Sequence, residues 1–369
     1  MTHNKAQPDL EPRCRATTIG SLPHVDVARG TELMLESTPA LPSWVQFPKR
    51  NMYENMMVQF TEGLPSLVEK GDRMAFDTSM PTFIEEITAF YENYLAAMEG
   101  GIKQALDYFA ISEQYGAGFR ELLSRLSEHV QTHDVWLLKG QVTGPFTLGT
   151  NLLDQEKQCS YYDETLHDIV VKSVELKAAW QMDQWQDFNL PMMIFIDEPA
   201  LLGFGSQTFI TVSREDVIAD INAVTNTIHA RGGLAGVHCE ENTDWSLLME
   251  TELDVLDFDA YDHMQAISLY PAELHAFLDR GGWLGWGIVP TLDRDAAASE
   301  TLESLLARFD RGMELLKSKG FDSDLLKRRA LITPSCGAGG VLTEPLAERV
   351  LKLLREFSWM LRDRYGFSG

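Results

Sequence analysis

The sequence has few cysteines, no long hydrophobic run and little positive charge. Its 369 residues contain only four cysteines, which are too sparse and too irregularly spaced for a disulfide framework: Cys14, Cys159, Cys239 and Cys336. No apolar run approaches the roughly 18 residues of a membrane span, and the polar N-terminus has no apolar segment typical of a secretion signal. These absences favour a cytoplasmic location and exclude a transmembrane segment.

The charge balance disfavours several classes of partner. Lys and Arg number 31 and Asp and Glu number 55, so the formal net charge is −24. A surface this acidic repels phosphate backbones and anionic lipids, so neither a nucleic acid nor a membrane surface is an expected partner. No glycine-rich phosphate-binding motif follows any predicted strand, which argues against nucleotide binding.

Eight short apolar runs alternate with amphipathic stretches along the chain. The helical pattern is clearest where Leu302, Leu305, Phe309, Met313 and Leu316 recur at intervals of three and four. Short runs bounded by Gly, Pro or polar residues are typical of buried parallel strands, and they cover residues 16–21, 74–77, 135–141, 192–197, 234–238, 255–259, 283–289 and 330–333.

This alternation predicts an α/β fold, a (β/α)8 barrel. One domain is expected over residues 14–369, after a flexible polar leader over residues 1–13. The segments 21–73 and 80–134 are longer than a minimal connection between a strand and a helix. They are expected to add helices or hairpins over the C-terminal mouth of the barrel.

Polar side chains gather where the predicted strands end, which is where such barrels carry their catalytic residues. His238, Glu240, Asp259 and Cys336 follow three of these strands and supply the nitrogen, oxygen and sulfur donors of transition-metal sites. Residues 238 and 240 point the same way in an extended strand while Cys239 points the opposite way, which favours Glu240 as a ligand. A hydrogen-bonded structural histidine and an inert buried cysteine are the alternative interpretation.

Two further motifs lie at strand ends. Asp197 and Glu198 close a fully apolar run and precede Pro199, which suits either a functional pair of carboxylates or an ordinary helix start. The turn Ile19-Gly20-Ser21 is either a tight turn permitted by glycine or a set of backbone N–H groups that binds a carboxylate.

Four motifs in order along the chain resemble a known family. They are TTIGSLP at 17–23, FIDEPAL at 195–201, GVHCEENTDW at 236–245 and LITPSCGAG at 331–339. Together they resemble the catalytic domain of cobalamin-independent methionine synthase. The wider superfamily also contains uroporphyrinogen decarboxylase and methylcobamide:thiol methyltransferases. The resemblance spans essentially the whole chain and is greatest to the short, single-barrel members.

The resemblance implies a zinc-dependent methyltransferase that acts on a thiol, with homocysteine as the acceptor. The zinc ligands of the family fall on His238, Glu240, Asp259 and Cys336, where Glu240 replaces a family cysteine. The charge of the ligand set stays at −3, but one soft ligand becomes a hard one. Cys239 remains an alternative second ligand.

The resemblance also implies how the amino acid and the methyl donor bind. By this resemblance, Ile19 and Ser21 bind the substrate carboxylate, and Asp197 and Glu62 bind the substrate amino group. Asp197 and Glu62 are also the two residues expected to be catalytic. Long synthases carry a histidine after the seventh strand that protonates the departing folate, and residues 287–293 contain none. A methylated corrinoid protein is therefore expected as the donor in preference to a methyl-folate.

Two other functions stay open. The replacement of the family cysteine by Glu240 suits a diverged barrel that binds another thiol or small metabolite. A decarboxylase of the uroporphyrinogen type needs basic side chains for its polycarboxylate substrate. The strand-end loops contain no Arg or Lys, which disfavours this second alternative.

Overall fold

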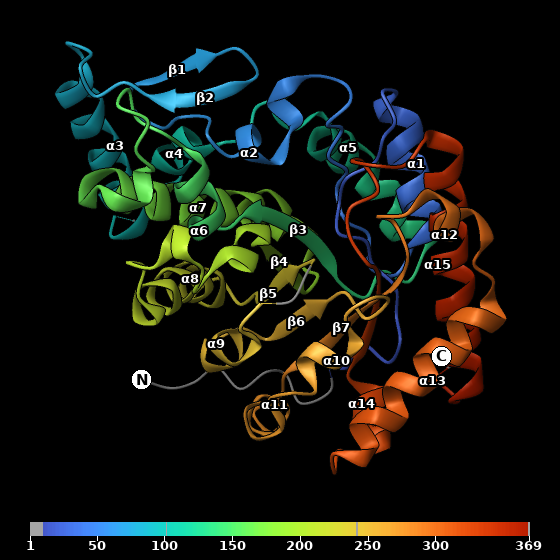
Figure 1. Cartoon of the computed structure of the whole chain (residues 1–369). Helices are drawn as coiled ribbons and strands as arrows, with labels where there is room; N and C mark the ends of the chain where they lie inside the picture. Colours follow the sequence, from blue (N-terminus) through green and yellow to red (C-terminus); the bar gives the residue numbers. More distant parts are fainter. Residues whose placement is uncertain (1–9, 101, 241–242, 368–369) are drawn as a thin grey trace.

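The computed structural model describes residues 10–100, 102–240 and 243–367 (Figure 1). Its centre is a parallel sheet of six strands in chain order, and nearly every strand residue is buried, as in sheets covered on both faces. The strands are β3 (Leu138–Thr143), β4 (Met192–Asp197), β5 (Leu234–Cys239), β6 (Val255–Phe258), β7 (Trp283–Val289) and β8 (Ala330–Pro334). The six predicted strands from residue 135 onward are confirmed with small shifts of their ends.

Two N-terminal segments lie along the edges of this sheet without forming regular strands. Ala16 makes a parallel bridge to Ile332 in β8, and Ser43 makes one to Lys139 in β3. Ser21 and Gln46 join the two segments through a third parallel bridge. The predicted strand at 16–21 corresponds to the first of these segments. In the second, Pro42 and Pro48 lack the N–H group that a longer ladder needs.

The predicted strand at 74–77 is wrong as a member of the parallel sheet. β2 (Arg73–Phe76) pairs antiparallel with β1 (Leu67–Lys70), and this hairpin lies apart from the six parallel strands (Figure 1). Gly71, with φ of +71°, and Asp72 form the tight connection between the two strands. A Gly-Asp pair between two short strands is typical of a hairpin, and this signal outweighs the apolar run that follows it.

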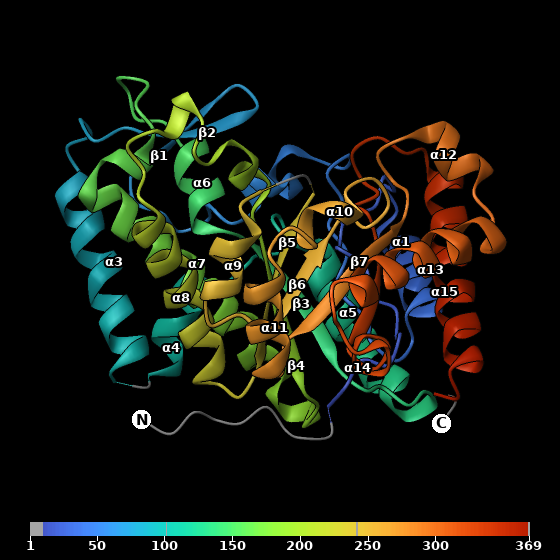
Figure 2. The ribbon, with the colours of Figure 1, turned by 60° about the horizontal axis from the view of Figure 1, so that its bottom comes forward.

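Long helices pack against the strands from outside the sheet. α7 (Glu164–Trp185), α8 (Arg214–His229), α13 (Leu302–Ser318) and α15 (Glu344–Arg364) each contact one or more strands (Figure 2). The helical pattern predicted over residues 302–316 falls within α13, and a further long helix is α5 (Ala117–Thr132). Shorter helices fill the connections: α6 (Pro145–Asn151), α9 (Trp245–Glu250), α10 (Met264–Ile267), α11 (Pro271–Asp279), α12 (Arg294–Ser299) and α14 (Ser323–Arg328).

The two long N-terminal segments contain the expected additional elements. Residues 21–73 include α1 (Val27–Ser37), the 3-10 helix η1 (Met52–Glu54), α2 (Met56–Gln59) and β1, and residues 80–134 include α3 (Phe83–Met98), α4 (Lys103–Leu106) and α5. α1 packs against α5 and α15, and α3 packs against α4. No helix within the described residues is long and apolar enough to cross a membrane.

Part of the predicted leader contacts the folded chain. The backbone N–H of Arg13 donates to the carbonyl of Arg328, and the Arg328 guanidinium donates to Glu11. Residues 1–9 of this segment lie outside the described residues.

A small apolar cluster fills the interior of the curled sheet beneath its polar end. Its buried members come from both N-terminal segments, from the residue directly before β3 and from β4, β6, β7 and β8: Ile19, Leu41, Leu137, Met193, Phe195, Val255, Trp283 and Leu331. Close packing in this layer holds the strand ends at fixed separations. The side chains that follow the strands therefore have a rigid base.

Candidate metal and substrate site

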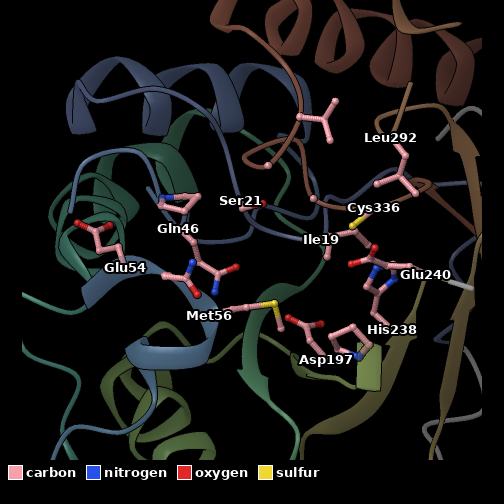
Figure 3. Close-up of a pocket in the computed structure, with 16 residues that line it drawn as sticks. Ile19, Ser21, Gln46, Glu54, Met56, Asp197, His238, Glu240, Leu292 and Cys336 are labelled. Carbon is pink, nitrogen blue, oxygen red and sulfur yellow. The ribbon is translucent and has the colours of Figure 1, made fainter. Parts of the chain in front are cut away.

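A cavity of about 340 Å³ opens at the C-terminal ends of the parallel strands (Figure 3). Six of the predicted site residues line it, and they come from four separate parts of the chain. Five of them are Ile19, Ser21, Asp197, His238 and Cys336. Glu240 lines it as well, directly after β5. The remaining lining residues come from residues 46–48, from η1 and α2, and from the segments that follow β4, β7 and β8: Gln46, Pro48, Glu54, Asn55, Met56, Pro199, Leu292, Gly337, Gly340 and Val341.

Three of the four predicted metal ligands meet in this cavity. One ligand atom each of His238, Glu240 and Cys336 lies within 4.8 Å of the other two. Figure 3 shows the imidazole, the carboxylate and the thiol turned toward one another. A nitrogen, an oxygen and a sulfur donor at such separations form a set that fits a transition metal such as zinc.

His238 is oriented by a buried hydrogen-bond chain. Its Nδ1 lies 2.8 Å from Oδ1 of Asp257, and the hydroxyl of Thr333 donates to Oδ2 of Asp257 at 2.7 Å. Because the carboxylate accepts a hydrogen bond from Nδ1–H, the lone pair of the neutral ring is left on Nε2. Nε2 of His238 is buried and has no hydrogen-bond partner among the described residues. Histidines that bind metals are commonly held by a carboxylate in this way.

Cys239 and Glu240, the two candidate metal ligands that follow His238, point in opposite directions because side chains alternate along an extended strand. Cys239 points away from the cavity, and its Sγ donates to the carbonyl of Glu198 at 3.1 Å. Glu240 lies on the cavity side together with His238, as the strand pattern predicts. Burial and then the nearby Glu240 carboxylate raise the pKa of the Cys336 thiol well above its ordinary value. A positive ion between these groups would reverse that shift.

The adjacent carboxylates Asp197 and Glu198 have different surroundings. Asp197 is buried at the cavity wall, and its Oδ1 has no hydrogen-bond partner in the described part of the chain. Burial raises the pKa of Asp197, against the opposing effects of Lys139 and of His238 when its ring is protonated. Glu198 points the other way and accepts hydrogen bonds from Phe146 and Thr147 at the start of α6. Asp197 therefore suits ligand binding, whereas Glu198 caps a helix.

The Ile19-Gly20-Ser21 turn is fixed from two sides. Below it, the fully buried Lys139 donates from Nζ to the carbonyl of Ile19 at 3.0 Å. Beside it, the backbone N–H of Gly339 donates to the Ser21 hydroxyl at 3.2 Å. Gly20 has φ of +144°, and a Cβ there would lie 2.8 Å from the Gln141 amide nitrogen. Only glycine permits this backbone conformation and this close approach.

Two predicted site residues lie away from the cavity lining. Asp259, the expected fourth metal ligand, does not join the group of three, and its Oδ1 accepts from the backbone N–H groups of Tyr261 and Asp262. Glu62, expected to meet the substrate amino group, accepts from the backbone N–H of Ser112 at 2.8 Å. Both carboxylates organise loop backbone in this structure.

Several residues of the site have no counterpart in the sequence-based prediction. Glu54 lines the cavity, is fully buried, and pairs with the Arg50 guanidinium and the Phe47 backbone N–H. Gln46 lines the wall beside it. Lys139 and Asp257 lie inside buried strands, where an ionisable residue requires a partner. That rule could have identified Lys139 and Asp257 from the sequence. Gln46 lies in an irregular segment and Glu54 ends the short helix η1, and neither position has such a signal.

The chain was compared with known families, proteins and structures. The sequence matches no protein-family model and none of the curated proteins. Among solved structures, a broad-specificity GH5-4 endoglucanase from Clostridium longisporum aligns with a TM-score of 0.36 and 10% sequence identity, over 68% of this chain and 77% of that chain. A likeness this distant gives no indication of what this chain does.

Proposed function

We propose that this protein is a zinc-dependent S-methyltransferase that methylates a thiol, with homocysteine as the acceptor and methionine as the product. The observation that carries the proposal is the convergence of His238, Glu240 and Cys336 in one cavity, with Nε2 of His238 buried and unpartnered. His238, Glu240 and Cys336 would hold the zinc ion, and three protein ligands with a free position for substrate are the pattern of catalytic zinc sites. A bound zinc ion would lower the pKa of a thiol so that its thiolate is available near neutral pH.

The residues around the metal ligands suit an amino-acid thiol. The backbone and hydroxyl of the turn at Ile19 and Ser21 would bind the carboxylate, and Asp197 would bind the ammonium group. Both groups are fixed by buried hydrogen bonds or packing before the ligand enters, which lowers the entropic cost of orientation. As the carbon–sulfur bond forms, the bond between the methyl group and its donor breaks and the thiol proton is released.

For the methyl donor we propose a methylated corrinoid protein. The loop after β7, where the long synthases place the histidine that assists folate departure, has Leu292 at the cavity wall. An aliphatic side chain there cannot transfer a proton to a leaving group. The cavity also disfavours decarboxylation of a polycarboxylate, because its described lining contains Glu54, Asp197 and Glu240 and no Lys or Arg.

We also propose that the two N-terminal segments complete a (β/α)8 barrel in the positions of the first and second strands. The bridges of Ala16 to β8, of Ser21 to Gln46 and of Ser43 to β3 connect the two edges of the six-stranded sheet. Ile19 and Leu41 from these segments share the interior apolar cluster with the six strands. The C-terminal mouth of such a barrel is where active sites lie.

The metal content of the purified protein tests the proposed site. Mass spectrometry should find about one zinc per chain in the wild type, and much less in Cys336→Ala and Glu240→Ala. Cys239→Ala is the matched control, since this cysteine points away from the cavity, and it should keep its zinc. Asp259→Ala should also keep its zinc, since Asp259 lies outside the group of three and binds loop backbone. A wild type that binds no metal even when zinc is supplied would contradict the proposal.

Activity is then measured by the formation of methionine from homocysteine. Methylcobalamin serves as the model for a corrinoid donor, and methyl-tetrahydrofolate is the alternative donor. Methionine formed from the corrinoid and not from the folate is the expected result. A zinc-loaded protein that uses neither donor would show that the barrel binds its thiol for another purpose.

A further inference from the structure

Gln46 is a cavity residue whose amide group is oriented by a chain of hydrogen bonds. The Gln59 amide nitrogen donates to the carbonyl of Tyr115. Because a backbone carbonyl only accepts, the Gln59 amide nitrogen must face Tyr115, and its oxygen is left to accept from the Gln46 Nε2 at 2.6 Å. The Oε1 of Gln46 is therefore a fixed acceptor. The positions of nitrogen and oxygen in both amide groups are thus inferred from their hydrogen-bond partners.

The Gln46 oxygen is available to a ligand. It receives no hydrogen bond from any residue that the structure describes, although the side chain is almost entirely buried and lines the cavity. It lies 3.0 Å from the position that a Cβ would occupy on Gly20, so the absent side chain of this glycine gives it space. An acceptor held in place and without a protein partner is well suited to a donor on a bound molecule.

Gln46 lies directly beside the Ile19-Gly20-Ser21 turn. The Gln46 backbone N–H donates to the Gly20 carbonyl at 3.0 Å, and the Leu22 N–H donates to the Gln46 carbonyl at 3.0 Å. Figure 3 shows Gln46 and Ser21 on the same side of the cavity, opposite the metal ligands. The turn supplies hydrogen-bond donors and Gln46 supplies an acceptor. An α-amino acid carries an anionic acceptor and a cationic donor on one carbon, which matches this arrangement.

We propose that Oε1 of Gln46 accepts a hydrogen bond from the ammonium group of an α-amino-acid thiol bound in this cavity. The inference rests on the proposed function, and it adds to Asp197 a second residue that binds the ammonium group and so favours an amino acid over a thiol that lacks an amino group. Gln59 acts as a positioning residue, because it holds the Gln46 oxygen toward the ligand.

Calorimetric titration with a matched pair of ligands tests this assignment. The zinc-loaded full chain is titrated with L-methionine and with 4-(methylthio)butanoate, which is the same molecule without its amino group. Gln46→Leu should weaken L-methionine binding about ten-fold, as expected for a hydrogen bond to a charged group, and change binding of the deamino compound less than about two-fold. Gln59→Leu releases the Gln46 amide and should give a smaller loss in the same direction.

Gln141→Leu is the control for the loss of a buried amide beside the same turn. Gln141 donates to the Trp44 carbonyl and lies against Gly20, but it does not line the cavity. This variant should keep the wild-type preference for the amino acid. Equal weakening of both ligands in Gln46→Leu, or no change in either, would overturn the assignment while leaving the proposed function intact. A wild type that binds neither L-methionine nor L-homocysteine would overturn both.

Discussion

At the scale of single residues, Lys139 has the most unusual environment. The side chain is fully buried in β3, and its nearest opposing charges belong to Asp197 and Asp257. Burial lowers the pKa of Lys139, and these two carboxylates act against that effect. The ring of Phe195 lies 4.3 Å from Nζ and adds a favourable cation–π contact. The ammonium group and the carboxylates therefore stabilise one another in their charged forms.

Replacement of Lys139 by Met keeps the length of the side chain and removes its charge. The free energy of unfolding should fall by about 1–3 kcal/mol, because the buried Ile19 carbonyl loses its donor and the carboxylates of Asp197 and Asp257 lose a nearby positive charge. Urea denaturation of the metal-free protein near pH 7.5 measures the loss. The double variant Lys139→Met/Asp197→Asn should recover part of it. If the two substitutions add without recovery, the charges are not coupled.

The residues of the site differ in how far the sequence predicts them. Alternation within a strand places His238 and Glu240 together and Cys239 apart, since the strand period is fixed by backbone geometry. Asp259 and Glu62 were expected at the site but bind loop backbone. Side chains along a loop do not alternate in a regular way. A shift of one residue along a loop can therefore turn a carboxylate away from the cavity and toward a nearby backbone N–H group.

At the scale of elements, α6 depends on a side chain from another part of the chain. Its N-cap residue Gly144 has no side chain to accept the free N–H groups of the first turn. Glu198 supplies the acceptors, binding the N–H groups of Phe146 and Thr147 and also the Thr147 hydroxyl. A carboxylate at a helix N-terminus is additionally favoured by the helix dipole. Glu198 thereby links the end of β4 to α6.

Glu198→Ala should destabilise the protein by about 2–4 kcal/mol, because it leaves buried N–H donors without an acceptor. Glu198→Gln keeps one acceptor oxygen in nearly the same shape and should cost about 1 kcal/mol. Chemical denaturation of the two variants beside the wild type measures the difference. Zinc content should stay unchanged in both, since Glu198 does not face the cavity. Equal stability of Glu198→Ala and the wild type would show that water replaces the cap.

The elements are predicted best where the apolar runs are continuous. β3 to β8 are buried on both faces, so their sequences read as apolar runs ended by Gly, Pro or polar residues. The segment around Ser43 has no continuous apolar run, because Pro42 interrupts it, and it contacts the edges of the sheet only through single bridges. The sequence pattern predicts a strand of the parallel sheet at 74–77 and none around Ser43, because a local pattern does not distinguish a hairpin strand from a sheet strand.

At the scale of the whole molecule, acidic residues far outnumber basic ones, and several carboxyl groups are buried at or directly after the ends of the parallel strands. The formal net charge is −24, and burial raises the pKa of Asp197, of Glu198 to about 7 and of Asp259 to about 6. These carboxyls take up protons in the folded state at a higher pH than in the unfolded state. Their stabilising contribution is therefore fully present below their unfolded pKa values and is lost as the pH rises through about 6 to 7.

The metal-free protein should accordingly become more resistant to urea as the pH is lowered from 8 to 5.5, because the folded state binds more protons than the unfolded state in this window. Loss of surface repulsion at lower pH acts in the same direction. Repeating the titration in about 1 M salt, where screening acts within roughly 3 Å, separates the two causes, since buried carboxyls are screened least. Glu198→Gln removes one of the buried carboxyls and should flatten the slope at high salt. A urea midpoint that rises as the pH is raised from 5.5 to 8 would contradict the prediction, because it would show that the folded state does not bind more protons than the unfolded state in this range.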